Sequence, residues 1–86
     1  MIPKVVEVRA LEGYRLLLQF QDGTVGTVDV TDELWGPMFE PLKDVTLFAQ
    51  VSVDKDLETI TWPNGADLAP EFLYRIARQG VPEAAP

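Results

Sequence analysis

Three acidic side chains alternate within one short segment, at Asp54, Asp56 and Glu58. Alternating carboxylates are the pattern with which calcium-binding loops supply oxygen ligands to the ion. An EF-hand loop also needs a central glycine and a distant glutamate, and this segment has neither. The segment therefore predicts a solvated hairpin turn, and we expect no metal site.

The chain lacks the side chains on which most small enzymes depend. It has no histidine, no cysteine and a single serine, Ser52, which excludes thiol nucleophiles, histidine relays and Cys/His zinc sites. Fourteen Asp and Glu residues make accidental carboxylate pairs unavoidable, but a chain of 86 residues leaves little room for a deep pocket. No glycine-rich phosphate loop is present. We therefore predict a non-enzymatic protein with no catalytic residue and no cofactor.

The formal charge of -7 restricts the partners of the chain. Its basic residues are few and scattered, so nucleic acid is an unsuitable partner, whereas a basic protein would complement the acidic surface. The alternative is that the charge only keeps a small protein soluble. No apolar run is long enough to cross a membrane, and residues 1–4 do not resemble a signal peptide. We expect a cytoplasmic protein that does not bind membranes.

Alternating apolar residues predict three strands, within residues 4–10, 14–20 and 24–30. Three-residue loops at 11–13 and 21–23 would pair Val8 with Leu16 and Leu18 with Gly26 and would keep one face apolar. Each loop would end in a glycine, Gly13 or Gly23, at the left-handed position that such loops need. The segment is therefore expected to form an antiparallel meander.

The second face of this meander would carry a small aliphatic cluster of Val5, Leu17 and Val25. Such a patch would be self-complementary about a two-fold axis, which favours a homodimer. The alternative is that these strands simply tolerate a few exposed aliphatic side chains.

Residues 31–42 form an irregular, proline-bounded segment. Its bulky side chains, Trp35, Met38 and Phe39, are expected either to close one end of the core or to form a second interaction patch. Asp44 is a suitable N-cap for a short helix at about 45–49.

A second hairpin is predicted from the pairing of Val53 with Ile60, and a last helix from Pro70 onward. The order is then β-β-β-α-β-β-α. This order predicts an α+β protein with a three-stranded antiparallel meander and a second hairpin, packed on two short helices. Residues 1–80 would form one domain and residues 81–86 a flexible tail.

The segment Trp62-Pro63-Asn64-Gly65-Ala66-Asp67 joins that hairpin to the last helix. Trp62 should point inward, and the side chains of Asn64 and Asp67 can accept hydrogen bonds from nearby backbone amides. The segment is either a well-specified turn or a recognition surface formed together with the Trp35 loop.

The chain resembles the bacterial domain of unknown function 2442 family, and the resemblance is most specific in this segment. The resemblance rests on VVEVRALEGYRLLLQFQDG, FEPLKDVTLFAQV and TITWPNGADLAPEFLY, which together cover most of residues 4–75. It implies a compact α+β fold without an established activity. It also implies an interaction module as the first hypothesis, in its most concrete form an antitoxin-like acidic partner of a small toxin-like protein. A sensory domain, a small ligand-binding domain and a carboxylate-based enzyme around Asn64 and Asp67 remain the alternatives.

Overall fold

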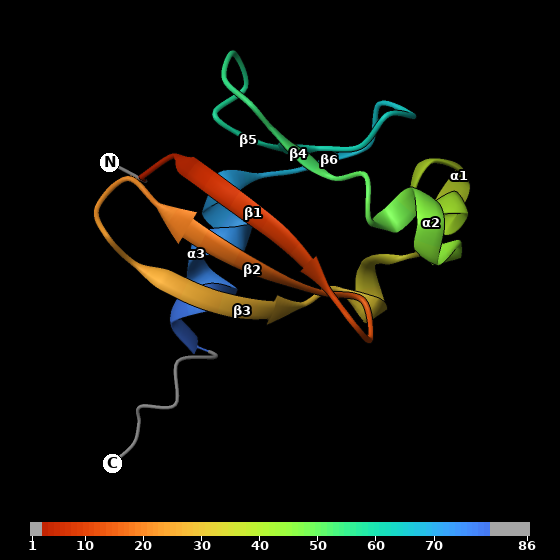
Figure 1. Ribbon diagram of the computed structural model, residues 1–86, viewed down its shortest axis with the longest axis horizontal. Helices are drawn as coiled ribbons and strands as arrows, with labels where there is room; N and C mark the ends of the chain where they lie inside the picture. Colours follow the sequence, from red (N-terminus) through yellow and green to blue (C-terminus); the bar gives the residue numbers. More distant parts are fainter. Residues whose placement is uncertain (1–2, 80–86) are drawn as a thin grey trace.

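The computed structural model describes residues 3–79 as two antiparallel sheets of three strands, with helical segments between and after them (Figure 1). Sheet A is ordered β1-β2-β3 and sheet B is ordered β4-β5-β6. The elements are β1 Val5–Leu11, β2 Arg15–Phe20, β3 Val25–Asp29, η1 Thr31–Glu33, α1 Gly36–Phe39, η2 Glu40–Lys43, α2 Val45–Phe48, β4 Ser52–Asp54, β5 Thr59–Thr61, β6 Asp67–Leu68 and α3 Pro70–Gln79. The predicted α+β class is confirmed. The tail expected at residues 81–86 lies outside the described residues.

Helix α3 covers one face of sheet A, and Figure 1 shows it behind the three strands. Leu73 and Ala77 of the helix are fully buried, as the predicted apolar stripe requires. The closest approach is at Gly26 of β3, where an added Cβ would lie 2.9 Å from the carbonyl oxygen of Ala77 and 3.0 Å from its Cβ. Only glycine allows the helix to come this close to the strand.

The hairpin between β2 and β3 has the predicted register. Leu18 is opposite Gly26 and Leu16 is opposite Val28. The loop ends at Gly23, whose φ of 91° lies in the left-handed region. The alternation of apolar residues and the position of one glycine were sufficient to specify this pairing.

The predicted register of the first hairpin was wrong by two residues. Leu16 is opposite Ala10, and the loop is 12–14 instead of 11–13. Tyr14 adopts a left-handed φ of 57° outside the strand. There its hydroxyl donates a hydrogen bond to the carbonyl of Lys43, and its ring lies edge-on to Phe48 at 5.4 Å. A shift of two residues keeps the same side chains on each face, so the predicted faces survive for most of β1.

The prediction that Val5 lies on the exposed second face of the meander is wrong. A bulge between Val5 and Glu7 places Val5 opposite Phe20, where it is only 2% exposed, and leaves Val6 exposed instead. The backbone N–H of Val5 donates to the carbonyl of Glu58 at 3.2 Å, which ties β1 to the turn of sheet B. The bulge therefore turns Val5 into the core where the two sheets meet.

Sheet B contains the predicted pairing of Val53 with Ile60. The carboxylate of Asp54 accepts hydrogen bonds from the backbone N–H groups of Asp56 and Leu57, at 2.9 and 3.1 Å, so this acid closes the turn. The two-residue strand β6 was not predicted. It pairs with β5 and places Asp67 in a strand, opposite Thr61.

The segment between the sheets runs through η1, α1, η2 and α2 at one end of the molecule (Figure 1). Leu34, Leu42 and Phe48 are the side chains that close the core there. The carboxylate of Asp44 accepts a hydrogen bond from the Thr46 backbone at 2.9 Å, so the predicted N-cap of α2 is confirmed.

Candidate functional site

The largest exposed apolar side chain in residues 3–79 is Trp35, at 72% exposure. It lies in extended backbone just before Gly36, whose φ of 86° redirects the chain, and Pro37 then starts α1. This reversal leaves Trp35 outside while its neighbour Leu34 is buried. The prediction that Trp35 closes the core is therefore wrong, and the alternative of an exposed patch fits its position.

Trp35 and its neighbours form a shallow groove of about 320 Å³, here called the Trp35 surface. Met38 is 44% exposed beside the tryptophan, and Phe39 is half-buried. The lining residues are Glu33, Trp35, Gly36, Pro37, Met38 and Phe39. Of these, Glu33, Gly36 and Pro37 were not predicted, although the Gly-Pro pair is a local signal for a turn.

The turn that contains Asn64 and Gly65 contacts the segment that forms the Trp35 surface. The amide Nδ2 of Asn64 donates to the carbonyl oxygen of Met38 at 2.9 Å, and its Oδ1 accepts from the N–H of Ala66 at 3.1 Å. Gly65 has a φ of 92°, and a Cβ there would lie 3.5 Å from the Cε of Met38. The structure therefore brings the two segments together, which was one of the two alternatives for residues 62–67.

Two other predicted site residues in this region do not belong to that surface. Trp62 is only 3% exposed, and its Nε1 donates to the carbonyl of Phe48 at 2.9 Å inside the core. The inward direction predicted for Trp62 is confirmed, and its side chain is not available to a partner. Asp67 is exposed on β6, where its role is that of a strand residue.

The segment that forms the Trp35 surface is acidic. Glu33 lines the groove, and Asp32 and Glu40 are exposed in the same segment. Residues 31–42 contain no lysine or arginine. An exposed indole face beside carboxylates attracts cations, because the ring quadrupole and the carboxylates both favour positive charge.

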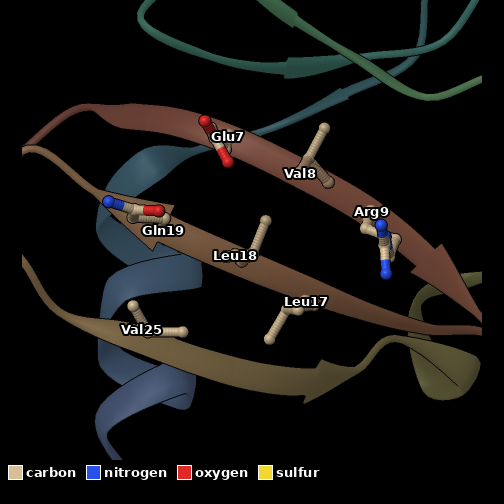
Figure 2. Close-up of a pocket in the computed structure, with 7 residues that line it drawn as sticks. All are labelled: Glu7, Val8, Arg9, Leu17, Leu18, Gln19 and Val25. Carbon is tan, nitrogen blue, oxygen red and sulfur yellow. The ribbon is translucent and has the colours of Figure 1, made fainter.

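The second candidate surface is the face of sheet A opposite α3, here called the open face (Figure 2). Its central row of paired residues runs across the three strands and consists of Arg9, Leu17 and Thr27. Leu17 lies on the middle strand, β2. Val25 is 52% exposed and Leu17 is half-buried. A hollow of about 360 Å³ lies here, lined by Glu7, Val8, Arg9, Leu17, Leu18, Gln19 and Val25.

The charges of the open face are balanced. Two acidic residues, Glu7 and Asp29, and two basic residues, Arg9 and Arg15, are all exposed on its three strands. The pKa of Asp29 is held below its ordinary value, chiefly by hydrogen bonds from the hydroxyl and backbone N–H of Thr31 and further by the positive charge of Arg15. The carboxylate is therefore ionised at neutral pH and can compensate Arg15.

Away from these two surfaces, a group of polar side chains joins α3 to the β2–β3 loop. The hydroxyl of Tyr74 donates to the carboxylate of Asp22 at 2.7 Å, and Arg78 donates to the Tyr74 oxygen at 3.2 Å. The hydrogen bond from Tyr74 is the largest of the effects that lower the pKa of Asp22. These two hydrogen bonds connect α3 to the β2–β3 loop.

Among residues 3–79, no three Asp or Glu side chains are grouped as metal ligands would be, and no helix is long and apolar enough to cross a membrane. Within its described residues the protein is thus a small α+β protein built from two antiparallel sheets and a covering helix, and its exposed apolar groups include those of the Trp35 surface and the open face.

The chain belongs to the DUF2442 family, the description of which is "protein of unknown function". The family model matches residues 5–79, so both sheets and α3 lie within the match. The resemblance noted from the sequence is therefore confirmed. No curated protein and no solved structure matches the chain significantly.

Proposed function

We propose that this protein is a non-catalytic interaction module that binds a basic protein through the Trp35 surface. The observation that carries the proposal is the 72% exposure of Trp35 on a segment fixed by a hydrogen bond, instead of in a loop without tertiary contacts. Tryptophan is among the residues most enriched at binding hot spots, and a preorganised hot spot loses little entropy on binding.

The acidic character of this segment supports a basic partner. An arginine or lysine of the partner could lie against the indole of Trp35 while Glu33 provides the opposite charge. The chain as a whole has a formal charge of -7, which would speed the encounter with a positively charged protein. In its most specific form, the proposal is an antitoxin-like role in the cytoplasm, with a small basic toxin-like protein as the partner.

The proposal is tested by quantitative capture from the cells that produce the protein. The tagged wild type is compared with Trp35→Ala and with Val45→Ala, a matched control in which another exposed side chain is shortened. We expect a basic protein that the wild type and the control retain and that Trp35→Ala loses. The captured protein is then purified, and its affinity for all three variants is measured by calorimetry.

The antitoxin-like form has its own test. Expression of the captured protein alone should arrest growth, and co-expression of the wild type should restore it, whereas co-expression of Trp35→Ala should not. Equal retention of every basic protein by the wild type and by a folded Trp35→Ala variant would contradict the interaction proposal. Growth that the captured protein does not affect would contradict only the antitoxin-like form.

A further inference from the structure

Sheet A is covered on one side only. Helix α3 packs against the buried face, whereas no segment within residues 3–79 covers Glu7, Arg9, Gln19, Val25 or Thr27, all of which are exposed. Antiparallel sheets commonly have one solvated face, but such a face is normally polar throughout. Here its middle row and its edge contain Leu17 and Val25, beside the hollow of about 360 Å³ (Figure 2).

We propose that a second copy of this chain binds the open face, so that two sheets pack against each other about a two-fold axis close to Leu17. Leu17 lies in the central row of the central strand. A two-fold axis at this point places the two Leu17 side chains in contact and gives each copy the same environment. The proposal is independent of the Trp35 surface, which lies in the connection between the sheets and stays available to another partner.

The distribution of charge identifies a second copy as the occupant. The chain has a formal charge of -7, so most approaches of one copy to another bring like charges together. The open face is an exception, because its two acidic residues are matched by Arg9 and Arg15. Since both signs are present on the same face, each charge of one copy can lie near an opposite charge of the other.

A basic partner would gain little on this face, because the face has no net charge to attract it. The face is also a poor match for nucleic acid, since Glu7 and Asp29 would repel the phosphates and offset the attraction of the two arginines. The charge pattern therefore favours self-association here and a basic partner at the Trp35 surface.

The size of the face determines how strong the dimer can be. Strands of five to seven residues, about 4.8 Å apart, give a footprint of roughly 250 Å² per copy. Stable complexes bury about 800 Å² per partner. We therefore expect a reversible dimer that dissociates at low micromolar concentration and forms at high micromolar concentration.

Sedimentation velocity of the purified full-length chain tests this proposal. The wild-type mass should rise from 9.6 kDa toward twice that value as the concentration increases. Leu17→Lys should remain a monomer throughout, since it places two positive charges at the axis. Val45→Lys is the matched control, because it introduces the same side chain at another exposed position and should dimerise like the wild type.

A second pair of variants tests the charge argument. Arg9→Glu makes the open face negative, whereas Lys43→Glu changes the net charge by the same amount away from that face. Arg9→Glu should abolish the dimer, and Lys43→Glu should weaken it only slightly. Circular dichroism verifies that each variant is folded.

Three outcomes would overturn the proposal. They are a wild type that stays monomeric at high micromolar concentration, a folded Leu17→Lys variant that dimerises like the wild type, and equal effects of Arg9→Glu and Lys43→Glu. None of them bears on the Trp35 surface, so this proposal and the proposed function can fail separately.

Discussion

The side-chain amide of Asn64 donates a hydrogen bond to the backbone carbonyl of Met38, 26 residues earlier in the chain, at 2.9 Å. This bond connects the turn that follows β5 to helix α1. It fixes the backbone beneath the Trp35 surface, although Asn64 itself is exposed.

The first prediction concerns this bond. Asn64→Ala removes both the bond to Met38 and the bond from Ala66, so it should lower the free energy of unfolding by about 1–3 kcal/mol, the usual net contribution of two hydrogen bonds. Amide hydrogen exchange at Met38 and Phe39 should become faster. Asn64→Asp keeps an oxygen that accepts from Ala66 but removes the donor to Met38, so it isolates the longer-range bond. Unchanged exchange at Met38 and Phe39 in both variants would show that the bond does not hold the surface.

The second prediction concerns the contact between β3 and α3. Gly26→Ala should destabilise the fold by about 1–3 kcal/mol, because the added methyl group overlaps the backbone and side chain of Ala77. Chemical denaturation measures the loss. Ala77→Gly relieves part of the overlap, so the double variant should be less destabilised than the sum of the two single variants. Strict additivity would mean that the two positions do not contact each other as described.

The third prediction concerns the loop between β2 and β3. Gly23→Val should cost about 1–2 kcal/mol, since a β-branched residue resists the left-handed φ of 91°. A Cβ at this position would have no atom within 4 Å beyond its chain neighbours, so the loss comes from the backbone alone. Gly23→Asn should cost less, because asparagine tolerates this conformation. Thermal unfolding distinguishes the two, and equal losses would point to a steric cause instead.

The fourth prediction concerns acid stability. The pKa of Asp22 is lowered in the folded state, chiefly by the hydrogen bond from Tyr74, relative to an ordinary value of 3.8. A depressed folded pKa adds stability that is complete above the unfolded pKa and is lost as the pH falls through the lower, folded value. Tyr74→Phe should therefore be less stable than the wild type at neutral pH, and the difference should shrink below about pH 3.8.

Carboxyl NMR titration checks this directly. In Tyr74→Phe, the pKa of Asp22 should rise toward its ordinary value, while the pKa of Asp29 should not change, because Thr31 holds that carboxylate independently. An unchanged pKa of Asp22 would remove the basis of the prediction.

Sequence reasoning recovered those parts of the fold in which alternation and turn chemistry agree. The β2–β3 register followed from Leu18, Gly26 and the glycine that ends the loop. The first hairpin was misplaced by two residues because Tyr14 adopts a left-handed conformation, which a tyrosine seldom does, in order to reach Lys43 and Phe48. That stabilisation comes from a distant segment, so no local pattern reports it.

Only part of each candidate surface was predicted, because the rest depends on contacts that no local pattern reports. Val5 and Val6 are identical in chemistry, so nothing in their order indicates that a bulge buries the first and exposes the second. Trp62 continues the alternation of a strand, and its burial followed from that period. Trp35 lies in a segment without a period, so its exposure was only one of two alternatives. The association of Asn64 with the Trp35 loop was likewise only one of two alternatives, because the bond to Met38 joins residues 26 positions apart and no local pattern reports it.

The close approach of α3 to Gly26 has a consequence for folding during synthesis. Both sheets precede the helix in the chain, and their hairpins can form from neighbouring residues. Until α3 has left the ribosome, however, the side of sheet A that bears Leu16, Leu18 and Val28 lacks the helix that completes its cover in the folded protein. A nascent chain with a formed meander and no helix would expose part of this apolar face, so the interval before the helix emerges is one in which the chain is prone to aggregate.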